Sequence, residues 1–196
     1  MIKSIKNEVD FAFFPLEAFA VYSVAKSQSK LEGDMAEVGV FQGGSAKLIC
    51  EAKGNGKLHL FDTFEGLPEL SDKDTHFGVK YWKKSQFGNT SVENVKKYLS
   101  KYSNVFYYKG TFPETANPIT DLKFSFVHID VDLYQSTMDC LKFFLPRLVQ
   151  GGIILSHDYH TGGVRSAFDE FFKEKKIPIV ELPGPQCMVI NNSANF

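Results

Sequence analysis

The stretch FSFVHIDVDLYQST, residues 124–137, decides the fold of this chain. Its apolar first part ends abruptly in two acids, Asp130 and Asp132, which lead directly into a helical pattern. This pattern predicts a buried strand whose carboxyl end carries carboxylates at the start of the next helix. Burying carboxylates is costly unless they are paired. The two acids therefore either serve chemistry or begin the helix.

Apolar runs alternate with amphipathic stretches along the rest of the chain. Strands are predicted at residues 35–41, 57–64, 105–112, 124–131, 153–159, 177–183 and 186–192. Helices are predicted at residues 11–28, 45–53, 91–102, 137–149 and 163–176. Strands that alternate with helices form a mostly parallel sheet covered on both faces, and the two consecutive final strands require one antiparallel strand. The predicted fold is α/β and doubly wound.

Length and composition indicate a single folded domain over residues 1–196. The chain is 43% hydrophobic, its formal net charge is -1, and its basic residues are scattered, so neither nucleic acid nor a membrane is an expected partner. No stretch reaches the length of a membrane span, and no cleavable signal is evident. The cysteines, Cys50, Cys140 and Cys187, lie far apart, which favours reduced core thiols in a cytoplasmic protein.

The first predicted strand runs into a glycine-rich turn, EVGVFQGGS. Its candidate binding residues are Glu37, Gly39, Gly43, Gly44 and Ser45. Glycines between a strand and a helix let the backbone approach a ligand, and the helix N-terminus attracts an anion. The spacing differs from G-x-G-x-x-G, which favours a smaller anion, such as an amino-acid carboxylate, over a dinucleotide. A tight turn that binds nothing is the alternative.

The second predicted strand ends at Asp62, 25 positions after Glu37. An acid at the tip of the second strand of such a sheet suits the two hydroxyls of a ribose. A surface acid in a turn is the alternative for Asp62 alone. The order strand, glycine turn, helix, strand, acid predicts a complete nucleoside site.

Five segments carry a resemblance to a known family. They are EVGVFQGGSAKL, FDTFEGLPE, GTFPET, HIDVDLYQSTMDCL and GGIILSHDYH. Together they resemble the class I S-adenosylmethionine-dependent methyltransferases, and more narrowly the macrocin O-methyltransferase (TylF-type) family, over residues 34–172. FDTFEGLP and DVDLYQST are the specific pieces, whereas many methyltransferases share the glycine turn.

The resemblance implies a Rossmann-like, seven-stranded sheet with the last strand antiparallel. It also implies that Glu37, Gly39 and Gly43 line the methionine end of S-adenosylmethionine and that Asp62 holds the ribose. Gly110 and Thr111, after the third strand, would lie near the adenine.

Polar residues follow the fourth and fifth predicted strands at the same edge of the sheet. Adjacent parallel strands lie about 4.8 Å apart, so Asp130 is expected to converge with His157 and Asp158, which end the next strand. The resemblance maps these three residues onto the ligands of a divalent cation, Mg²⁺ or Mn²⁺. The cation would lower the pKa of the acceptor hydroxyl.

The chain departs from the family at His157, where relatives usually carry a carboxylate or an amide. An imidazole shifts metal preference from Mg²⁺ toward Mn²⁺, Fe²⁺ or Zn²⁺. Alternatively, no metal binds and either His157 or His160 is the general base. Asp132 has its own alternative: with Gln135 three residues later, it forms a DxxQ cap for the following helix.

Two segments are candidate lids. The loop 64–90 has no sustained period and offers aromatic and polar walls for a methyl acceptor: Phe64, His76, Phe77, Tyr81, Trp82 and Phe87. The phenylalanine-rich helix 11–28 is either a second lid or the surface of a homodimer.

Three hypotheses follow for function. The first is a metal-assisted O-methyltransferase that acts on a hydroxyl of a sugar or another small metabolite. The second is a metal-independent N- or O-methyltransferase of the same fold. The third is a non-catalytic S-adenosylmethionine-binding module or another α/β nucleotide binder.

Overall fold

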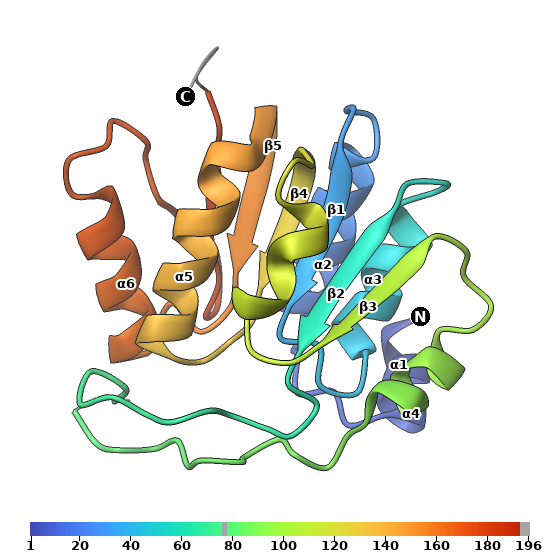
Figure 1. Ribbon diagram of the computed structural model, residues 1–196, viewed down its shortest axis with the longest axis horizontal. Coiled ribbons are helices and arrows are strands. Elements are labelled where there is room, and N and C mark those ends of the chain that lie inside the picture. The colour runs from blue at the N-terminus through green and yellow to red at the C-terminus, as the bar shows by residue number, and fades with distance from the viewer. Residues whose placement is uncertain (76–77, 193–196) are drawn as a thin grey trace.

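The computed structural model describes residues 1–75 and 78–192, and its centre is a single mixed sheet (Figure 1). Its strands within these residues are β1 (Asp34–Val38), β2 (Leu58–Asp62), β3 (Val105–Lys109), β4 (Phe124–Ile129), β5 (Leu148–Ser156), β6 (Val180–Glu181) and β7 (Cys187–Ile190). The order is β3-β2-β1-β4-β5-β7-β6. The first five strands run parallel, and β7 is antiparallel to both β5 and β6. The predicted seven-stranded, doubly wound α/β fold is confirmed.

Helices cover both faces of the sheet (Figure 1). They are α1 (Ile2–Glu8), α2 (Pro15–Gln28), α3 (Gly44–Ala52), α4 (Val92–Tyr98), α5 (Tyr134–Phe144) and α6 (Gly162–Phe172), with short 3₁₀ turns η1 (Glu114–Ile119) and η2 (Leu145–Arg147). Side chains of α2 and α3 pack in one core layer with Met35 of β1, whereas α5 and α6 pack in the other with Ala36. The side chains of successive strand residues thus point into opposite core layers, as strand geometry requires. No helix among the described residues has both the length and the apolarity needed to cross a membrane.

The helix predicted over residues 11–28 is present but lacks residues 11–14, because it starts at Pro15, a residue whose φ suits a first helical turn. The helix α2 begins at Pro15, and Phe14 is extended, with φ -72° and ψ 161°. A proline disfavours the helical conformation in the residue that precedes it, which explains this start. Residues 10–13 instead lie along the wall of a cavity, and the short helix α1 precedes them.

Two helix caps that local sequence patterns predict, Thr90 with Glu93 for α4 and Asp132 with Gln135 for α5, do not form. The N-cap of α4 is Ser91, whose hydroxyl accepts from the Asn94 amide, while the Thr90 hydroxyl donates to the Phe41 carbonyl. At α5 the N-cap is Leu133, and Asp132 does not cap the helix. The carboxylate that accepts a hydrogen bond from the Tyr134 amide belongs to Asp74, at 2.6 Å.

Candidate functional site

A cavity of about 710 Å³ opens at the carboxyl ends of the strands, within the usual size range of small-molecule sites. Nine predicted site residues line it: Gly39, Gly44, Ser45, Asp62, Gly110, Thr111, Asp130, His157 and Asp158. The strand register explains this convergence. Val38 pairs with Phe61, and Ile129 pairs with Ser156, so the residues that follow these pairs emerge side by side. Glu37, Gly43 and His160 are outside the cavity lining, and His160 is exposed.

The turn after β1 requires glycine at position 39. Gly39 has φ +86°, a conformation that L residues rarely adopt, and a Cβ atom there would lie 1.8 Å from the Asp130 carbonyl oxygen. The tip of β1 therefore lies directly against the end of β4. Gly43, also with φ +86°, precedes the first residue of α3 and acts as its N-cap.

Asp62 stabilises the glycine turn as well as lining the cavity. Its Oδ2 accepts hydrogen bonds from the backbone amides of Val40, at 2.7 Å, and Phe41, at 2.8 Å. Its Oδ1 accepts from the amide of Phe64 at 2.6 Å. The Thr63 hydroxyl lies 3.5 Å from Oδ1, but its one hydrogen has a shorter contact with the Gly66 carbonyl, at 2.8 Å. Because a carboxylate has about four lone-pair sites, Asp62 keeps capacity for a ligand. No local pattern in the sequence indicates this bracing role.

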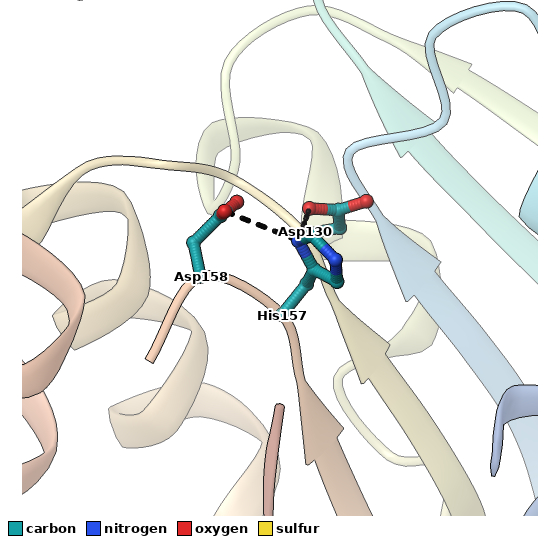
Figure 2. A group of neighbouring side chains, drawn as sticks. All are labelled: Asp130, His157 and Asp158. Atoms are coloured by element: carbon teal, nitrogen blue, oxygen red, sulfur yellow. Dashed lines mark ion pairs between the residues drawn. The ribbon is translucent and has the colours of Figure 1, made fainter. Parts of the chain in front are cut away.

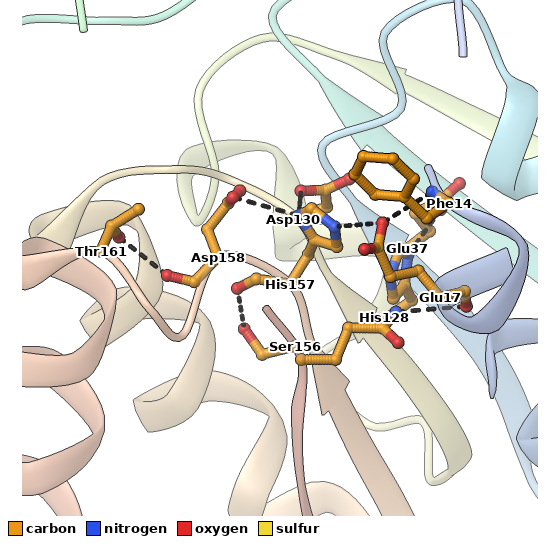
Figure 3. Close-up of polar contacts among 10 residues, drawn as sticks. Phe14, Glu17, Glu37, His128, Asp130, Ser156, His157, Asp158 and Thr161 are labelled. Carbon is orange, nitrogen blue, oxygen red and sulfur yellow. Dashed lines mark hydrogen bonds and ion pairs between the residues drawn. The ribbon is translucent and has the colours of Figure 1, made fainter. Parts of the chain in front are cut away.

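Glu37 contacts His128 beneath the cavity (Figure 3). Both side chains are fully buried, and Glu37 Oε1 lies 2.8 Å from His128 Nδ1. Burial raises the pKa of Glu37 to about 8 and lowers the pKa of His128 to about 4, so both groups are neutral near pH 7. The predicted contact of Glu37 with the methionine end of a cofactor stays a prediction. The sequence analysis did not identify His128, although a histidine within an apolar strand is a visible signal.

Asp130, His157 and Asp158 form an acid–imidazole cluster at the ends of β4 and β5 (Figure 2). His157 Nδ1 lies 3.5 Å from Asp130 Oδ1 and 3.2 Å from Asp158 Oδ1. Burial raises the pKa of Asp130 to about 6. For His157, burial alone would lower the pKa, but the Asp130, Asp158 and Glu17 carboxylates outweigh it and raise the pKa well above its ordinary value.

The cluster has a donor set that fits a divalent cation. One ligand atom from each of its three residues lies within 4.8 Å of the others. Two carboxylates and one imidazole suit Mn²⁺, Fe²⁺ or Zn²⁺ as well as Mg²⁺. The second ring nitrogen, Nε2, lies 3.4 Å from Glu17 Oε2 (Figure 3). A metal-binding histidine usually donates its other ring N–H to such a carboxylate. Glu17 was not predicted, because nothing near it in the sequence indicates this contact.

The loop 64–90 runs past the carboxyl ends of the strands (Figure 1). Tyr81, Trp82 and Phe87 line the cavity, and the Phe87 ring meets that of Phe41 edge to face at 5.5 Å. Phe64 is buried at the start of the loop. The predicted wall residues 76 and 77 lie outside the described residues.

Asp74 anchors this loop to α5. It is 2% exposed, and besides the Tyr134 amide it accepts from the backbone amide and the hydroxyl of Ser71, at 2.6 and 2.8 Å. The contact with the Tyr134 amide attaches the middle of the loop to α5, the helix that follows β4 and Asp130.

We expect Asp74→Ala to destabilise the protein by about 2 kcal/mol, because it orphans a helix N-terminal amide and two loop donors. The melting temperature should fall by about 4–8 °C, and limited proteolysis should cleave the loop sooner. Asp72→Ala is the matched control, since its side chain is 98% exposed and pairs with Lys80. Equal melting temperatures for the two variants would contradict the anchoring role.

Comparisons with known proteins agree with this architecture. A family model described as Macrocin-O-methyltransferase (TylF) matches residues 18–182. A relative from Streptomyces olivaceus, 8-demethyl-8-(2,3-dimethoxy-alpha-L-rhamnosyl)-tetracenomycin-C 4'-O-methyltransferase, is 28% identical over 166 residues, covering 78% of this chain and 63% of the relative. The chain spans 63%, 60% and 54% of the lengths of three curated relatives, less than two thirds in each case.

Solved structures share the fold. The O-methyltransferase NovP has a TM-score of 0.76 at 19% identity, over 90% of this chain and 79% of that chain. TomG, an O-methyltransferase from Streptomyces achromogenes solved in complex with S-adenosylmethionine, has a TM-score of 0.67 at 13% identity, over 98% of this chain and 88% of that chain.

Proposed function

The chain belongs to the macrocin O-methyltransferase (TylF) family, and we propose that it transfers the methyl group of S-adenosylmethionine to a hydroxyl oxygen of a small molecule. The observation that carries this proposal is the shared cavity, which joins the glycine turn, Asp62 and the acid–imidazole cluster. A donor site and a site for activating an acceptor therefore adjoin each other.

In this proposal the donor lies along the ends of β1, β2 and β3. The turn at Gly39 and Ser45 receives the methionine end, where bare backbone permits close approach. Asp62 receives the ribose hydroxyls with the lone pairs that its backbone contacts leave, and Gly110 and Thr111 flank the adenine. Glu37, which is outside the cavity lining, is assigned to the methionine end of the donor by the family resemblance alone.

The acceptor lies between the donor and the ends of β4 and β5. Asp130, His157 and Asp158 would hold a divalent cation, and its positive charge would lower the pKa of the acceptor hydroxyl. The cavity orients the hydroxyl toward the methyl group. This positioning supplies much of the rate enhancement. Trp82 and Phe87 cover the cavity and exclude water. The proton released from the hydroxyl would pass to a carboxylate of the cluster, through the oxygen that does not hold the cation.

We infer that the acceptor is a sugar hydroxyl. The support is the Streptomyces olivaceus relative, whose name describes methylation of a rhamnosyl-bearing compound. The aromatic side chains of the loop suit this substrate, because the apolar face of a sugar ring packs well against aromatic rings. Other small hydroxylated metabolites remain the broader class.

Metal-independent transfer with a histidine base is the second candidate, favoured by the location of His157 in the cavity. The three carboxylates around His157 raise its pKa, which favours the protonated imidazole over the neutral form that a general base requires. His160 is outside the cavity lining. The first candidate is therefore preferred.

A homodimer and a cytoplasmic location are further parts of the proposal. Helix α2 and the residue before it expose Phe14, Leu16 and Phe19, at 70%, 66% and 62%, which suits a surface shared by two copies. The three free cysteines are all buried, as expected for a protein of a reducing compartment.

Calorimetry with S-adenosylmethionine and with NAD tests the donor site. We expect saturable binding of S-adenosylmethionine and none of NAD, because the glycine spacing and Asp62 suit one nucleoside. Transfer of a radiolabelled methyl group to rhamnosylated small molecules then tests catalysis. Binding of NAD in preference would overturn the proposed function, and donor binding without any transfer would support the non-catalytic alternative.

A further inference from the structure

The N-terminal segment holds the His157 ring on two sides. The ring of Phe13 stacks on the imidazole with centroids 4.4 Å apart and planes inclined by 9°. Glu17 lies at the edge of the imidazole, with Oε2 3.4 Å from Nε2. Both residues precede residue 18, where the family match begins. Each contact therefore joins His157, inside the matched region, to a residue outside it.

The position of Glu17 is itself well defined. Its side chain is 6% exposed, and the same Oε2 atom accepts a hydrogen bond from the Phe14 amide at 2.9 Å (Figure 3). Its backbone carbonyl lies 3.4 Å from Gln186 Nε2, and its carboxylate packs against Gly184 in the turn between β6 and β7. The first turn of α2 thus fixes this carboxylate beside the imidazole.

The two ring nitrogens of His157 face different partners. Nδ1 points to Asp130 and Asp158, and Nε2 points to Glu17 (Figures 2 and 3). An imidazole can bind a cation through Nδ1 only when the lone pair is on Nδ1 and the proton is on Nε2. A carboxylate at Nε2 selects this tautomer, because it accepts the Nε2–H hydrogen bond.

We propose that Glu17 is a positioning residue that holds His157 as the Nε2–H tautomer and so leaves Nδ1 free to bind a divalent cation together with Asp130 and Asp158. This inference rests on the proposed cation site. The family resemblance places a carboxylate or an amide at position 157. Where the family has a charged or amide ligand, this chain has a neutral imidazole, and Glu17 places a negative charge at its Nε2, the ring nitrogen that faces away from Asp130 and Asp158.

Titration of the protein with Mn²⁺, followed by calorimetry, tests the proposal on Glu17→Gln. An amide oxygen in the place of Oε2 still faces both the Phe14 amide and Nε2. Because this nearly isosteric variant has lost the negative charge, that oxygen is a weaker acceptor for Nε2–H and holds the required tautomer less firmly. We expect the Kd for Mn²⁺ to rise about 10–100-fold. The variant should melt at the wild-type temperature and bind S-adenosylmethionine with wild-type affinity.

Two further variants separate positioning from charge and from folding. Glu8→Gln removes a carboxylate from the same terminal segment, where it pairs with Lys47, and should leave the Kd for Mn²⁺ unchanged. In a His157→Asp background there is no tautomer to select, so adding Glu17→Gln should not weaken Mn²⁺ binding further. If Glu17→Gln fails to fold, Glu17→Asp keeps the charge, shortens the reach to Nε2 and should also raise the Kd.

The outcomes separate this proposal from the proposed function. Equal Mn²⁺ affinity of the wild type and the position-17 variant would overturn the role of Glu17 and leave the cation site intact. The same loss in the wild-type and His157→Asp backgrounds would also overturn it, because charge alone would then explain the effect. Failure of the wild type to bind Mn²⁺ would overturn the cation site and the role of Glu17 together.

Discussion

Replacing Asp158 with asparagine is expected to lower methyl transfer at least about 100-fold and to remove its dependence on added Mg²⁺ or Mn²⁺. The substitution removes one carboxylate from the acid–imidazole cluster and leaves an amide, which is a weak ligand, against His157 Nδ1. Asparagine suits the position because Asp158 has φ +57°, a conformation that asparagine tolerates. The fold should therefore survive.

Initial rates measured against cation concentration, with and without EDTA, check this result. Asp121→Asn is the matched control, since Asp121 is an exposed residue of the same type remote from the cavity lining. Binding of S-adenosylmethionine should be unchanged in Asp158→Asn, because the donor occupies the other strand ends. Wild-type activity that persists in full with EDTA would count against the cation and in favour of a histidine base.

Replacing Gly39 with alanine is expected to destabilise the protein by about 3 kcal/mol or more and to abolish binding of S-adenosylmethionine. Two effects add. Alanine is strained at φ +86°, and its Cβ would lie 1.8 Å from the Asp130 carbonyl oxygen, where neither backbone can yield without separating β1 from β4. The melting temperature should fall by at least about 6–12 °C.

Gly54→Ala isolates the backbone strain from the clash. Gly54 has φ +60°, and a Cβ there would meet nothing within 4 Å, so we expect a loss of about 1–2 kcal/mol and normal donor binding. Thermal unfolding and calorimetry of both variants check the comparison. If Gly39→Ala proved no more destabilising than Gly54→Ala, the close contact of β1 with β4 would be wrong.

Local sequence patterns predicted the sheet and predicted that the main site residues lie together at the carboxyl ends of its strands. The family resemblance is confirmed by the match over residues 18–182. The convergence of Asp130 with His157 was predictable because each follows directly on a strand and adjacent parallel strands end together. The proposed ligand and catalytic roles of these residues stay predictions until the experiments above are done.

Cap predictions failed where a distant residue competed with the local one. A DxxQ pattern made Asp132 the expected cap of α5, yet Asp74, 60 positions earlier, takes the Tyr134 amide. Asp132 instead lies beside Asp158, where burial and the neighbouring carboxylate raise its pKa well above the ordinary value. Capping preferences describe a residue and its near neighbours, so they cannot account for an acid supplied by a long loop.

The sequence by itself determined the order of strands and helices, the glycine turn and the acids at the strand ends. All of these depend on side-chain periodicity and backbone preferences within a few residues. Only the tertiary structure decided which partner each buried polar group has. Glu37 meets His128 across 91 positions, and Glu17 meets His157 across 140. A buried polar group takes whatever partner the packing of the layers brings within reach, and no local pattern in the chain records that choice.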